Sequence, residues 1–149
     1  MGAKTQQGIK DLAHAFNNVV GNQVGAVGKN IDDLVKASKT FTGNPKKASQ
    51  FINSMKPFKN SKFTEAGRNL TKHPKVMGYE STDVMRKTLN TEAKINEAAQ
   101  SAVENIIKNG NEVRKTQGRY GKIVEYRLDN GYGARFLEET NEMIGFIEP

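Results

Sequence analysis

The stretch AGRNLTKHP, residues 66–74, gathers side chains that could handle a phosphate group. It holds Arg68, Thr71, Lys72 and His73, the last being one of two histidines in the chain. Imidazole exchanges protons near neutral pH and can act as general acid or base, while Lys and Arg stabilise phosphate charge. A histidine before proline is also often a loop residue that bonds the backbone. The stretch therefore predicts either a reaction centre or a basic loop at a helix end.

The net charge of the chain comes from one central segment. The 149 residues carry 23 Lys and Arg against 16 Asp and Glu, a net charge of +7. Residues 39–80 hold nine of these basic residues and two glutamates, so the remainder of the chain sums to zero. Unpaired like charges repel one another, and such a segment favours a polyanionic partner.

A second basic cluster surrounds an aromatic residue, Tyr120. Its members are Lys108, Arg114, Lys115, Arg119 and Lys122, opposed by Glu112. Cations with an aromatic ring suit RNA, because the cations meet phosphates while the ring stacks on a base. A half-buried sheet residue is the alternative interpretation of Tyr120.

The composition also excludes several kinds of site. The absence of cysteine excludes disulfides and thiolate zinc sites, and a zinc site built on two histidines would need several carboxylates. P-loop, GxGxxG and GxSxG motifs are absent. We therefore expect no cofactor and no metal ion. No apolar run reaches the roughly 18 residues of a spanning helix, and the first residues do not form a signal peptide, which indicates an aqueous, cytoplasmic setting.

Apolar periodicity predicts helices followed by strands. Helices are expected over residues 7–36 (with His14 as a structural residue), 46–55, 64–70, 83–89 and 91–109. Strands are expected over residues 122–128, 134–139 and 143–149, with 111–118 as a further candidate. An α+β fold follows, with N-terminal helices before a small antiparallel sheet of three or four strands.

Two arginines are expected on strands that flank the Asn130-Gly131 turn. Arg127 and Arg135 have Glu125 and Glu138 near them. They predict either a cross-strand ion pair, worth about 0.2–1 kcal/mol, or an arginine on an open sheet face that points at RNA.

Metal-independent RNA cleavage fits these side chains. The substrate supplies its own nucleophile, the 2′-OH, so the enzyme needs a base, an acid for the leaving 5′-oxygen, and cations for the phosphorane. His73 is the candidate for proton transfer, with Lys72 and Arg68 as its nearest cations in sequence. Thr71 could orient a phosphate or the imidazole.

The blocks AGRNLTKHP, IIKNG, GRYGKIVEYRLDNGYGARF and IGFIEP together resemble a known family. The chain is similar to toxin domains at the C-terminus of bacterial polymorphic toxins, including contact-dependent inhibition and Rhs-type proteins. The resemblance covers residues 61–149 and implies a ribonuclease of the barnase/EndoU/colicin/RelE class. It marks Arg68, Thr71, Lys72, His73, Tyr120, Arg135 and Phe136.

The resemblance implies a delivered antibacterial effector that acts in the target-cell cytoplasm. We expect a toxin domain over residues 61–149, after a helical leader over residues 1–60, with nuclease (hydrolase) activity on tRNA. His73 would be general acid or base, Lys72, Arg68 and Arg135 would stabilise phosphate charge, and Thr71 or Tyr120 would position it. A cognate immunity protein, acidic enough to cover the basic cleft, is the expected partner.

Three other functions stay open from the sequence. A non-catalytic RNA-binding or DNA-binding module would share the basic segment and survive loss of His73. A partner-docking adaptor protein would bind through residues 1–55 and have no affinity for polyanions. A DNase would require Mg²⁺, and the absence of a compact Asp/Glu/His cluster in the sequence argues against it.

Overall fold

The computed structural model describes residues 39–149, and the helices predicted over residues 7–36, with His14, lie outside the described residues. Helices and short turns come first: α4 (Pro45–Ser54), α5 (Glu65–Lys72), the 3₁₀ turn η3 (Pro74–Met77), α6 (Thr82–Thr88) and α7 (Glu92–Asn109). The strands follow: β1 (Asn111–Gln117), the 3₁₀ turn η4 (Gly118–Tyr120), β2 (Gly121–Arg127), β3 (Gly133–Leu137) and β4 (Met143–Ile147). This order confirms the predicted α+β class, with a four-stranded sheet.

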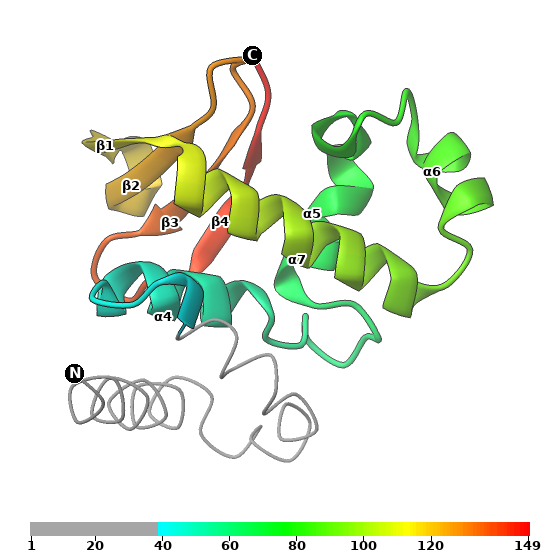
Figure 1. The fold of residues 1–149 in the computed structure, drawn as a ribbon, viewed down its shortest axis with the longest axis horizontal. Coiled ribbons are helices and arrows are strands. Elements are labelled where there is room, and N and C mark those ends of the chain that lie inside the picture. The colour runs from blue at the N-terminus through cyan, green and yellow to red at the C-terminus, as the bar shows by residue number, and fades with distance from the viewer. Residues whose placement is uncertain (1–38) are drawn as a thin grey trace.

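The sheet is an antiparallel meander in the order β1-β2-β3-β4, covered on one face by helices. Helix α7 packs against β2 and β3, while α5 packs against α7 and against the edge strand β4. Figure 1 shows α7 running diagonally across the molecule, with the sheet toward one end and α5 and α6 toward the other. No helix among residues 39–149 is both long and apolar enough to cross a membrane.

The hydrophobic core lies between α7 and the covered face of the sheet. Along β2 and β3 alternate side chains point to opposite faces, and the core-facing set is Val124, Tyr126, Ala134 and Phe136. The other face of β2 carries Glu125 and Arg127, as the alternating pattern predicts. Helix α7 contributes the apolar stripe expected from its sequence, which consists of Ile95, Ala99, Ala102, Val103, Ile106 and Ile107.

Capping side chains set the helix ends close to where the sequence places them. Thr91 accepts a hydrogen bond from the Lys94 backbone N–H at 3.2 Å and caps the start of α7, which agrees with the helix predicted over residues 91–109. Gly110 ends the helix, but its φ of −75° is not left-handed. A Cβ at Gly110 would lie 2.5 Å from the Ile106 carbonyl oxygen and 3.1 Å from the Arg127 nitrogen. Glycine is needed here because a side chain would collide first with the last turn of α7 and then with β2.

Helix α4 belongs to the same core as the sheet. Phe51 and Ile52 are buried in one hydrophobic cluster with Tyr126 and Phe136. The Tyr126 hydroxyl donates to Gln50 Oε1 at 2.6 Å, which joins α4 to β2. The core of the described residues therefore extends across the predicted boundary at residue 60.

Candidate active site at the end of helix α5

His73 is held where α5 stops. Thr64 begins the helix by accepting from the Gly67 N–H at 3.0 Å, and the His73 N–H closes it on the carbonyls of Asn69 and Leu70, each at 3.1 Å. Pro74 cannot extend the helix and starts the next turn instead. The helix thus runs two residues beyond the expected end at Leu70, and its last turn fixes the His73 backbone.

The His73 ring faces a carboxylate from the far end of the chain. Its Nδ1 lies 3.4 Å from Glu148 Oε2, and the two side chains are 31% and 39% exposed. Glu148 follows directly after β4, the strand against which α5 packs. A carboxylate at Nδ1 orients an imidazole and favours the tautomer with its proton on that nitrogen. Glu148 was not predicted, because no local pattern relates residues 73 and 148.

Arg68, Thr71 and Lys72 share one face of α5, since residues three and four apart are neighbours on a helix. The Thr71 hydroxyl donates to the Arg68 carbonyl at 2.6 Å and accepts from Arg68 Nη1 at 3.3 Å. The Arg68 guanidinium also lies 5.4 Å from the centre of the Phe58 ring. Thr71 and Phe58 therefore limit the positions open to the Arg68 head.

The two cations of α5 keep their charge available. Within residues 39–149 neither Arg68 nor Lys72 has a carboxylate oxygen within 4 Å. The end of a helix carries partial negative charge, which favours these cations but disfavours an anion. A phosphate bound here would therefore depend on the two side chains and gain nothing from the helix dipole.

A second charged group occupies the uncovered face of the sheet and centres on Glu125. Its carboxylate accepts from Lys115 Nζ at 2.9 Å and from the Nε atoms of Arg127 and Arg135 at 3.0 Å each. Burial would raise the pKa of Glu125, but the hydrogen bonds from the three cations outweigh it and lower the pKa to about 2. The predicted cross-strand ion pair of Arg135 is therefore present.

Arg135 is only partly used by this ion pair. Its side chain is 26% exposed, and among the described residues no hydrogen bond involves its Nη atoms. Arg127, in contrast, also donates through Nη1 to the Gly131 carbonyl at 2.6 Å, which ties it to the β2–β3 turn. Of the two arginines, Arg135 therefore has more N–H donors left for a ligand.

The strand register places the two groups near each other. Arg135 pairs with Gly145, and Glu148 comes three residues later, roughly 10 Å along the strand. Among the described residues no hydrogen bond or ion pair joins His73 to Arg135. One RNA strand could therefore contact both residues through different phosphates, although the two side chains do not bond each other in the described residues.

Tyr120 lies elsewhere. It ends the turn between β1 and β2, whereas His73 and Glu148 adjoin the opposite end of the sheet, beside Arg127 and its partner Gly133. The strand between these ends is seven residues long, or roughly 20 Å. The structure does not bring Tyr120 to His73.

A cavity of about 280 Å³ lies at the other end of α5. It is lined by Asn53, Lys56, Pro57, Glu65, Glu142 and Met143. Burial raises the pKa of Glu65, with Glu142 adding to the effect and Lys56 opposing it. Two carboxylates would repel phosphate, so the cavity is unsuited to hold RNA. In the described part of the chain no three His, Cys, Asp or Glu side chains cluster as metal ligands.

Comparison with known proteins gives one match. A family model of CdiA C-terminal tRNase toxin domains matches residues 52–148. No curated protein and no solved structure matches the chain. The matched segment includes α5, η3, α6, α7 and all four strands, and it confirms the resemblance to toxin domains of contact-dependent inhibition. Because it covers well over half of the 149 residues, the chain belongs to the family of CdiA C-terminal tRNase toxin domains.

Proposed function

We propose that this toxin domain is a metal-independent endoribonuclease that cleaves tRNA through attack of a 2′-OH, with His73 transferring a proton. One observation carries the proposal. The His73 imidazole is paired with Glu148 through Nδ1 and ends the helix that bears Arg68 and Lys72, neither of which has a carboxylate partner within residues 39–149. Proton transfer and phosphate binding are thus available at one place.

The reaction consumes no co-substrate, because the RNA supplies its own nucleophile, the 2′-OH. A base removes the 2′-OH proton, and the 2′-oxygen forms a bond to the adjacent phosphorus. The bond from phosphorus to the 5′-oxygen then breaks, and an acid protonates that leaving oxygen. The products are a 2′,3′-cyclic phosphate and a 5′-OH.

His73 can act as the base or as the acid, and a ring that has taken the 2′-OH proton carries the proton that the leaving 5′-oxygen needs. With the Nδ1 proton donated toward Glu148, Nε2 has a lone pair that can accept the 2′-OH proton. The protonated ring can donate a proton to the leaving oxygen. Glu148 acts on the reaction by holding and polarising the ring.

The cations have separate roles in this proposal. Arg68 and Lys72 bind the phosphate that reacts and stabilise the extra charge of the phosphorane. Thr71 positions Arg68 through the hydrogen bond between their side chains. Arg135, whose strand partner Gly145 comes three residues before Glu148, binds a phosphate near the reacting one.

The test is cleavage of tRNA in excess EDTA by the wild-type chain and by His73→Ala. Loss of one general acid or base costs roughly 10²–10⁴-fold in rate. Lys72→Ala should also lower the rate. Lys87→Ala is its matched control, because both lysines are exposed in the last turn of a helix.

Three outcomes separate the alternatives. Products with 2′,3′-cyclic phosphate in EDTA support the mechanism. Cleavage that needs Mg²⁺ contradicts metal independence. Tight, salt-sensitive binding without cleavage by the wild-type chain would make this a non-catalytic RNA-binding domain.

A toxin domain of this family acts in the bacterium that receives it. The producing cell must then protect its own tRNA, which implies a cognate immunity protein. We expect that protein to be acidic, because it must cover the unpaired cations of α5.

A further inference from the structure

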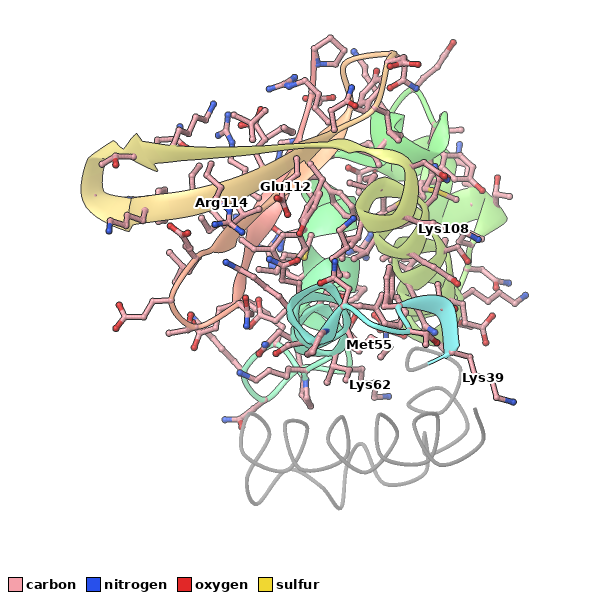
Figure 2. All side chains as sticks on the ribbon, turned by 60° about the vertical axis from the view of Figure 1, so that its left-hand side comes forward. Lys39, Met55, Lys62, Lys108, Glu112 and Arg114 are labelled. Atoms are coloured by element: carbon pink, nitrogen blue, oxygen red, sulfur yellow. The ribbon has the colours of Figure 1, made fainter. Side chains whose placement is uncertain are left out.

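Strand β1, the turn η4 and the first residues of β2 form an arm whose tip extends beyond the rest of the sheet, whereas β2 pairs with β3 and is buried from Ile123 to Tyr126. β1 is an edge strand whose one neighbour in the sheet is β2, and it is exposed over almost its whole length. Figure 2 shows the two paired strands, in yellow, reaching outward from the other described elements. Because β1 and the turn after it bury almost no surface, packing within the fold does not explain why they extend so far.

The tip of the arm presents an aromatic ring stacked with a cation. Gly118 and Gly121 take positive φ angles of 43° and 69°, which lets the chain reverse in a short turn. Tyr120 is 39% exposed in this turn. The Arg119 guanidinium lies 5.1 Å from the ring centre and donates from Nη2 to the Tyr120 hydroxyl at 3.0 Å. These contacts place the Arg119 cation beside the exposed ring.

The unpaired charge of the arm is also at its tip. Nearer the base, Lys115 is paired with Glu125, and Arg114 lies 3.7 Å from a carboxylate oxygen of Glu138. Arg119 and Lys122 have no carboxylate oxygen within 4 Å among residues 39–149. An exposed ring with a cation on either side in sequence is the combination that binds single-stranded RNA.

We propose that the tip of this arm is a nucleobase-stacking site for an unpaired nucleotide of the substrate RNA, with Tyr120 as the stacking ring. Arg119 and Lys122 bind the phosphates on either side of that base. The site lies roughly 20 Å from His73 along β2, so it contacts a nucleotide that is not cleaved. This inference rests on the proposed RNA-cleaving function for its substrate, and it assigns Tyr120 to substrate binding at a distance from the reacting phosphate.

Binding can be measured apart from cleavage in a His73→Ala background. Fluorescence anisotropy with a labelled tRNA gives the Kd at several salt concentrations. Tyr120→Ala should raise the Kd by about ten-fold, the lower part of the range for loss of one base stack, with the salt dependence unchanged. Tyr120→Phe should bind as well as the parent, because the ring remains.

Substitutions of Lys122 and of Val113 should change RNA binding differently from Tyr120→Ala. Lys122→Ala should lower the slope of log Kd against log salt by roughly one phosphate contact. Val113→Ala removes an exposed apolar side chain from the same arm and should leave both quantities unchanged. In the cleaving protein, Tyr120→Ala should raise KM for tRNA about ten-fold and leave kcat unchanged.

The outcomes distinguish this inference from the proposed function. If the wild-type chain does not cleave tRNA, the function fails, but loss of RNA affinity on Tyr120→Ala still supports the stacking site. If cleavage occurs and Tyr120→Ala changes neither Kd nor KM, the stacking site is refuted while the function stands. An equal loss of RNA affinity in Tyr120→Phe and Tyr120→Ala would also refute stacking. The hydroxyl, and not the ring, would then be the group that binds RNA.

Discussion

Replacing Glu125 with glutamine should destabilise the fold by an amount that depends strongly on pH. The Glu125 side chain is 5% exposed and holds three cations. Burial alone would raise its pKa, but the hydrogen bonds lower it from 4.5 to about 2. This difference corresponds to about 3 kcal/mol of folding free energy.

The direction with pH follows from the lowered pKa. Above pH 4.5 the Glu125 carboxylate is ionised in both the folded and the unfolded chain. Its full contribution to the free energy of unfolding is then present. As the pH falls toward 2, the unfolded chain binds the proton first, so the contribution is lost. By pH 3 the stabilisation from Glu125 should have fallen by about 2 kcal/mol. Glutamine, which is neutral at every pH, lacks this dependence.

The assay is urea unfolding of the wild-type chain and Glu125→Gln at pH 7, 5 and 3. The free energy of unfolding should differ by about 3 kcal/mol at pH 7 and by about 1 kcal/mol at pH 3. Glu138→Gln is the matched control, because Glu138 is more exposed and its ion pairs are 3.7 and 3.9 Å long. It should cost under about 1 kcal/mol. A Glu125→Gln difference that stays constant from pH 7 to pH 3 would refute the reasoning.

Three further substitutions test the site and its support. Glu148→Gln keeps a hydrogen-bond acceptor near His73 but removes the charge, so kcat for tRNA cleavage should fall about ten-fold with KM unchanged; a rise in KM alone would contradict an orienting role. Lys72→Ala should weaken tRNA binding by the His73→Ala protein and lower the salt slope by roughly one contact, whereas Lys87→Ala, measured alongside it, should do neither. Tyr126→Phe leaves a buried amide oxygen of α4 without its donor and should cost about 1–3 kcal/mol in urea unfolding; a cost near zero would show that the buried bond between helix and sheet contributes little.

The elements that were predicted correctly have local signals. Helix α7 combines a threonine cap, an apolar stripe at helical spacing and a glycine at its end. Strand β2 alternates along its length, which placed Val124 on the core face and Glu125 on the other. Both signals depend only on residues close together in the sequence. Contacts with distant parts of the chain therefore did not alter these two elements.

The relations between elements were not predictable in the same way. The contact of His73 with Glu148 joins residues 75 apart, and it depends on α5 packing beside β4. Asn96 of α7 accepts from the Thr64 N–H at 3.0 Å and thereby fixes where α5 begins. Neither fact has a trace in local periodicity. The distance between Tyr120 and His73 likewise follows from strand register, which the sequence indicates only through the turn chemistry.

The basic residues of the domain fall into two groups, those paired with a carboxylate and those without one, and in the proposed function the two groups would bind RNA differently. On the sheet, Glu125 neutralises part of the charge of its three neighbours and fixes the direction of Arg135. On α5, Arg68 and Lys72 have no carboxylate within 4 Å in the described part of the chain. Cations that are held by a carboxylate bind a phosphate with defined geometry but less strongly, while unpaired ones supply most of the attraction. Because the helix dipole at the end of α5 opposes an anion, the proposed mechanism needs both Arg68 and Lys72 to bring a phosphate to His73, and we expect loss of either cation to weaken phosphate binding.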